Sequence, residues 1–136
     1  MRILAIDYGS KRTGLAMSDP LGITAQPLKT VPTEKLVCEL LELHEEYELD
    51  KLIMGLPIRM NGEEGPAAQN IRKIKSMLEN KTKLAIELVD ERLSTSGMQK
   101  TLIAGDVSRA KRKLVIDKLA ATYLLQGYLA KLGRLC

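Results

Sequence analysis

The sequence predicts an α/β domain built on a mixed five-stranded sheet with helices on its faces. Three apolar segments joined by short turns come first, and strand-like and helix-like segments then alternate to the end of the chain. Strands joined by tight turns pair antiparallel, whereas strands joined through a helix pair parallel. The expected order of elements is therefore βββαβαβαα. No repeat, low-complexity segment or linker interrupts the 136 residues, so we expect one domain over residues 1–136.

The antiparallel part is expected to contain strands over residues 3–6, 13–18 and 23–31. The first strand is apolar on both faces, as in a central strand that is covered on both sides. Residues 9–12 form the turn of a hairpin. Pro27 cannot donate a hydrogen bond to a neighbouring strand, so the third strand is expected at an edge of the sheet, and Pro32 ends it.

Helices and strands alternate from Thr33 onward. Thr33 is a suitable N-cap for a helix that reaches residue 47, and Pro66 suits the first turn of the next helix. Buried strands are expected over residues 51–57 and 84–89. A short helix is expected over residues 94–104 and a final helix over residues 111–132.

The composition favours a soluble cytoplasmic protein with a mild preference for polyanions. Lys and Arg exceed Asp and Glu by 21 to 17, which gives a net charge of +4. With four Tyr and no Phe or Trp, the chain is expected to hold nucleic acid through phosphates and shape rather than through base stacking. Two cysteines without metal-ligand spacing fit a reducing compartment, and no apolar segment is long enough to cross a bilayer.

The segment AIDYGSKRTG raises a question, because it places Asp7 at the end of a buried strand and directly before a glycine turn. Such an acid can be a metal ligand, part of a loop that holds nucleotide phosphate, or an ordinary strand-end residue that meets solvent or caps a turn. This segment alone leaves the three interpretations open.

Three further acids stand where a charge needs an explanation. Asp90 and Glu91 end the fifth strand, and ligands of open sheets collect at the carboxyl ends of parallel strands. Asp117 lies in the apolar stripe of the last helix, with Ala121 and Leu124. A charge on that stripe costs several kcal/mol unless it is paired or binds a metal. A partner charge for Asp90 or Asp117 is the competing explanation.

Acids from separate elements at one edge of the sheet would repel one another unless a cation neutralised them. Carboxylate oxygens suit Mg²⁺ or Mn²⁺. Two such ions about 4 Å apart can activate a water and hold the leaving oxygen of a phosphodiester. Nearby basic residues would contact the phosphate backbone: Lys11, Arg12, Arg59, Arg92, Arg109, Lys111, Arg112 and Lys113.

Four segments, in this order, resemble the YqgF (RuvX-like) family of bacterial RNase H-like nucleases. They are AIDYGSKRTGLAMSD, MGLPIRMNGEEGPAAQNIRK, VDERLSTSGMQKTL and KRKLVIDKLAATYLLQGYL. The resemblance implies an RNase H-like fold and a nuclease that matures the 5′ end of pre-16S ribosomal RNA. It also implies Holliday junction resolution as an alternative activity. Ribosomal precursor particles are the implied partners, besides pre-rRNA or branched DNA.

The resemblance assigns the catalytic and metal-binding roles to Asp7, Glu91 and Asp117, with Asp90 as the adjacent candidate. One departure from RNase H-like enzymes at large is that the fourth strand ends in Gly55-Leu56-Pro57 and supplies no acid. The third ligand must then come from the fifth strand.

Two other functions compete with the nuclease. Actin-like and sugar-kinase ATPases also open with an Asp-x-Gly turn after a first strand, but they need two such domains, and 136 residues supply one. A ribosome-assembly factor that binds RNA without cutting it fits the charge, although it leaves Asp117 unexplained.

Overall fold

The structure is a computed structural model that describes residues 1–92 and 109–133, and within the last helix the side chains of residues 119–132. The elements follow the expected order. They are β1 (Ile3–Asp7), β2 (Arg12–Ser18), β3 (Ala25–Pro32), the 3-10 helix η1 (Thr33–Lys35), α1 (Leu36–Tyr47), β4 (Lys51–Leu56), α2 (Pro66–Thr82), β5 (Ile86–Asp90) and α4 (Arg109–Gly133). The helix expected over residues 94–104 lies outside the described residues.

The five strands form one mixed sheet in the order β3-β2-β1-β4-β5. β1 pairs antiparallel with β2 and parallel with β4, and β4 pairs parallel with β5. β1 is therefore central and β3 is an edge strand, as Pro27 predicted. The chain has the predicted α/β architecture, a five-stranded mixed sheet flanked by helices.

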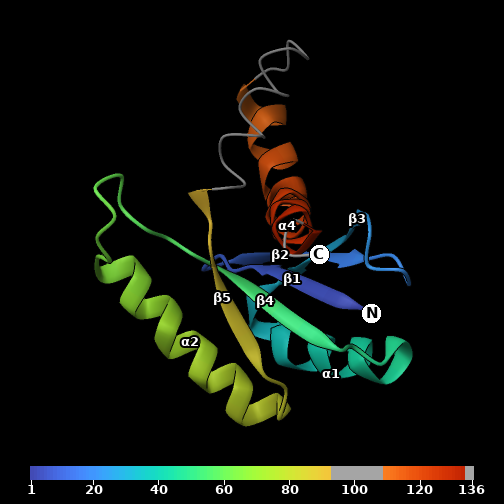
Figure 1. Ribbon diagram of the computed structural model, residues 1–136. Coiled ribbons are helices and arrows are strands. Elements are labelled where there is room, and N and C mark those ends of the chain that lie inside the picture. The colour runs from blue at the N-terminus through green and yellow to red at the C-terminus, as the bar shows by residue number, and fades with distance from the viewer. Residues whose placement is uncertain (93–108, 134–136) are drawn as a thin grey trace.

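The side chains of the strands alternate between two cores. Leu4 and Ile6 of β1 face α1 and α2, whereas Ile3 and Ala5 face α4. Figure 1 shows these two layers, with α1 and α2 below the sheet and α4 above it. Each core closes only when its helices are in place, because an apolar sheet face must be covered to be stable.

The parallel strands fix the edge of the sheet that matters for function. β1, β4 and β5 end together, at Asp7, Leu56 and Asp90. We call this edge the carboxyl rim and the opposite edge the amino rim. The β1–β2 turn and the loop over residues 57–65 both leave from the carboxyl rim (Figure 1).

Several predicted boundaries need correction by one or two residues. The third strand is Ala25–Pro32, the fourth ends at Leu56, the fifth is Ile86–Asp90, and the last helix begins at Arg109. Thr33 does not cap α1, because it lies in η1 and makes no capping hydrogen bond. Its hydroxyl instead binds the β1–β2 turn. Pro66 does occupy the first turn of α2.

Candidate active site

Asp7 is the last residue of β1 and lies on the α4 face of the sheet. Ile3 and Ala5 pack under α4, and strand alternation assigns Asp7 to the same face. The β1–β4 register pairs Ile6 with Met54, so Gly55 is the next residue of β4 beside Asp7. Asp7 is partly exposed. The central strand thus delivers a carboxylate to the carboxyl rim, next to a position without a side chain.

Glu91 reaches the same place from the other side of β4. Its backbone N–H donates to the Leu56 carbonyl over 3.1 Å. A Cβ atom added to Gly55 would lie 3.2 Å from Glu91 Cβ, 3.3 Å from its Oε2 and 3.4 Å from Leu124 Cδ2. The Glu91 side chain therefore lies over Gly55, between the sheet and α4. Gly55 separates the two acids and leaves room for them.

Gly55 is a site residue that sequence reasoning missed. The fourth strand supplies no acid. It contributes Gly55, which has no side chain and so leaves room for Glu91. The only signal was a glycine within an apolar strand, which can mark a place where another group approaches the backbone.

The two acids at the end of β5 have opposite electrostatic environments. Burial, and secondarily the charge of Asp90, raises the pKa of Glu91. Asp90 accepts hydrogen bonds from Arg92, with Nη2 to Oδ2 at 2.6 Å and Nε to Oδ2 at 2.8 Å. This pairing lowers the pKa of Asp90. Leu88 packs on the α1 and α2 side, and alternation assigns Asp90 to that side, away from Glu91.

Asp117 belongs to α4, but its side chain lies outside the described residues. Its position is one helical turn before Ala121, which is fully buried against the sheet. Convergence of its carboxylate with Asp7 and Glu91 stays a prediction. Among the side chains that the structure describes, no three Asp, Glu, His or Cys residues are grouped so that they could hold a metal ion.

The predicted basic residues lie in different places. Lys11 at the end of the β1–β2 turn and Arg12 at the start of β2 are exposed at the carboxyl rim, and Arg59 is exposed in the loop after β4. Arg92 is engaged by Asp90. The remaining four, Arg109, Lys111, Arg112 and Lys113, lie in the first turns of α4, and their side chains are outside the described residues.

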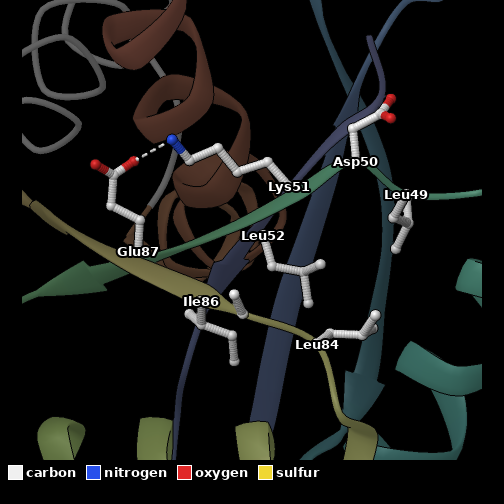
Figure 2. Close-up of a pocket in the computed structure, with 8 residues that line it drawn as sticks. Leu49, Asp50, Lys51, Leu52, Leu84, Ile86 and Glu87 are labelled. Carbon is white, nitrogen blue, oxygen red and sulfur yellow. Dashed lines mark ion pairs between the residues drawn. The ribbon is translucent and has the colours of Figure 1, made fainter.

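A cavity of about 480 Å³ lies at the amino rim, at the opposite end of β4 and β5 from Glu91. Figure 2 shows its apolar floor and the ion pair above it, between Lys51 Nζ and Glu87 Oε2 at 3.0 Å. Its apolar lining residues are Leu49, Leu52, Leu84, Ala85 and Ile86. The candidate acids are therefore not in this cavity. None of the described helices is long and apolar enough to cross a membrane.

Comparison with known proteins places the chain in a family. The family described as RuvX, Holliday junction resolvase, matches residues 1–131. The chain belongs to the RuvX family. A relative from Heliobacterium modesticaldum is 48% identical over 95% of this chain and 89% of its own, and one from Clostridium kluyveri is 42% identical over 98% and 100%. Both carry the name "Putative pre-16S rRNA nuclease".

The chain also shares its fold with a solved structure. Thermus thermophilus RuvC, in complex with a Holliday junction substrate, superposes with a TM-score of 0.59 over 98% of this chain and 96% of its own. The sequence identity is 14%, so this likeness concerns the fold alone. It confirms the RNase H-like fold that the four sequence segments implied.

Proposed function

We propose that this chain is a metal-dependent nuclease that hydrolyses phosphodiester bonds during 5′-end maturation of pre-16S ribosomal RNA. The observation that carries the proposal is the placement of Asp7 and Glu91 on one face of the carboxyl rim, on either side of Gly55. Membership of the RuvX family and the names of its relatives support the substrate. The cytoplasm and ribosomal precursor particles follow as the proposed location and partners.

The donor set fits a hard divalent cation. Asp7 and Glu91 offer carboxylate oxygens, the ligands that Mg²⁺ and Mn²⁺ prefer. Glu91 has a raised pKa because it is half-buried and close to Asp90, so its charge is costly without a cation. Asp117 is the proposed third ligand. When bound, one or two such ions would supply the charge that activates a water and neutralises the leaving oxygen.

The remaining residues would bind and orient the substrate. Lys11 and Arg12 extend from the turn that directly follows Asp7, so they would contact phosphates next to the acids. Arg59 would contact the strand further along the rim. Arg92 is already bound to Asp90, and it would contribute by keeping that carboxylate away from Glu91.

The test is cleavage of a structured pre-16S 5′ leader with Mg²⁺ or Mn²⁺. We expect Asp7→Asn to reduce cleavage by more than about 100-fold, because even outer-shell partners of metal ligands contribute up to that factor. Asp50→Asn is a matched control, since this exposed acid lies at the amino rim, far from the candidate acids. Among the described residues, its carboxylate accepts one hydrogen bond, from Arg2 N–H at 2.7 Å. Wild-type rates in Asp7→Asn would refute the metal-ligand role.

A DNA four-way junction is the second candidate substrate, because the family is described as a Holliday junction resolvase. The same variants are therefore assayed on a labelled junction in parallel. Cleavage of the junction but not of the leader would identify branched DNA, rather than pre-16S RNA, as the substrate. Binding without cleavage of either substrate, unchanged in Asp7→Asn, would identify a non-cleaving assembly factor.

A further inference from the structure

The β1–β2 turn is held by a residue that is distant in the sequence. Thr33 Oγ1 donates to the Gly9 carbonyl over 2.6 Å, and Thr33 N–H donates to the Lys11 carbonyl over 3.0 Å. Thr13 Oγ1 lies 2.8 Å from Thr33 Oγ1. Because the Thr33 hydroxyl proton is used on Gly9, the Thr13 hydroxyl is the donor of this third bond.

These bonds hold two backbone carbonyls of the four-residue turn over residues 8–11, those of Gly9 and Lys11. Thr13 follows the turn in β2 and is fully buried. A Cβ atom at Gly9 would overlap the Arg12 carbonyl oxygen, so the turn is also closed tightly on itself. The hydroxyl contact comes from η1, on the side of α1. The turn is therefore braced from the face opposite to the acids.

Two cations lie at the end of the braced turn. Lys11 is its last residue, Arg12 is the first residue of β2, and both are exposed. Strand alternation assigns Arg12 to the same face as its neighbour but one, Gly14, which pairs with Asp7. A long cationic side chain loses conformational entropy when it binds a phosphate, and a backbone fixed in advance reduces that loss.

We propose that Thr33, together with Thr13, is a positioning residue that holds the β1–β2 turn so that Lys11 and Arg12 contact substrate phosphates beside Asp7. Thr33 acts only through the backbone of the turn and touches no reacting group. This inference rests on the proposed function, because it needs a nucleic-acid substrate at the carboxyl rim.

The experiment measures binding of a labelled pre-16S leader and of a four-way DNA junction across a series of salt concentrations. Thr33→Val keeps the shape and removes the hydroxyl, whereas Thr33→Ser keeps the hydroxyl. We expect Thr33→Val to bind more weakly, with a salt slope reduced by about 0.7–0.9 for each phosphate that Lys11 or Arg12 no longer neutralises. Thr33→Ser is expected to restore the wild-type slope. Adding Thr33→Val to the Lys11→Ala/Arg12→Ala double variant should change neither the affinity nor the salt slope any further.

Ser18→Ala is the matched structural control. The Ser18 hydroxyl is buried and braces the amino rim, where it accepts from Ile3 N–H at 2.8 Å and lies 3.1 Å from the Met1 carbonyl oxygen. Its loss should lower stability but leave the salt slope unchanged. A wild-type slope in Thr33→Val, or an effect that adds fully to that of Lys11→Ala/Arg12→Ala, would overturn the inference alone. Absence of binding by the wild-type chain would overturn the proposed function and the inference with it.

Discussion

At the end of β4, a position without a side chain lies between two acids. Gly55 is buried, and a Cβ atom added there would be in tight contact with the Glu91 carboxylate at 3.3 Å and with Leu124 at 3.4 Å. The spacing of Asp7 and Glu91 therefore depends on this glycine as well as on the acids. A site built on strand ends keeps such spacing more accurately than a site built on loops.

Gly55→Ala is expected to reduce the rate of cleavage strongly and the free energy of unfolding only slightly. The new methyl group would meet Glu91 at 3.2–3.3 Å and displace it by a few tenths of an ångström. Since a misplacement of about 1 Å can cost about 100-fold in rate, we expect a loss of about tenfold. Single-turnover cleavage and urea unfolding measure the two effects. A large loss of stability with an unchanged rate per folded molecule would contradict this role of Gly55.

Glu91→Gln is expected to change how stability depends on pH. The pKa of Glu91 in the folded chain lies above its ordinary value of 4.5. The folded state therefore binds more protons than the unfolded state just above pH 4.5, and wild-type stability falls as the pH rises through the folded pKa. The glutamine variant lacks this fall, so its free energy of unfolding should increase relative to the wild type as the pH rises above 4.5, until Glu91 is ionised in the folded state.

Chemical unfolding without divalent cations measures this difference at each pH. The Asp90–Arg92 pair contributes with the opposite sign, but it is present in both proteins and largely cancels in the comparison. Addition of Mg²⁺ or Mn²⁺ should stabilise the wild type more than the variant. A stability difference that is constant across the pH range would show that Glu91 titrates normally.

Individual elements were predicted better than the contacts between them. Residues 3–6 read as a central strand because both faces are apolar, and Pro27 indicated an edge, and both features hold in the structure. Thr33 was misassigned as a helix cap because local pattern favours Thr before a helix, whereas its hydroxyl is used by Gly9, 24 residues away. Long-range hydrogen bonds leave no periodic signal in a sequence.

At the scale of elements, a polar cluster attaches the end of α4 to the sheet. Tyr128 Oη donates to Glu87 Oε2 over 2.7 Å, and Lys51 Nζ pairs with the same carboxylate and lies 5.4 Å from the centre of the Tyr128 ring. The hydrogen bond and the ion pair lower the pKa of Glu87. This cluster lies at the amino rim, away from the candidate acids.

Tyr128→Phe is expected to lower the free energy of unfolding by about 1 kcal/mol, because it removes one hydrogen bond to a half-exposed charge and keeps the buried ring. Thermal or urea unfolding measures this loss. Cleavage per folded molecule should not change, since the cluster lies at the far end of the sheet. A loss of cleavage without a loss of stability would mean that the end of α4 influences the carboxyl rim.

At the scale of the molecule, α4 covers one face of the sheet, and its buried side chains complete the core that starts with Ile3 and Ala5. The first and last described elements of the chain are therefore in direct contact. A chain that ends at residue 108 would expose that apolar face. We expect it to show no cooperative thermal transition and to bind a hydrophobic dye, whereas the intact chain unfolds in one step. A cooperative transition in the shortened chain would refute this.

The contact between β1 and α4 also sets the order of events during synthesis. β1 leaves the ribosome before α4, which must cover it. Asp7 is thus in the nascent chain well before the core behind it can close. A chain proposed to cut ribosomal RNA would therefore assemble its active face only after α4 has left the ribosome that makes it.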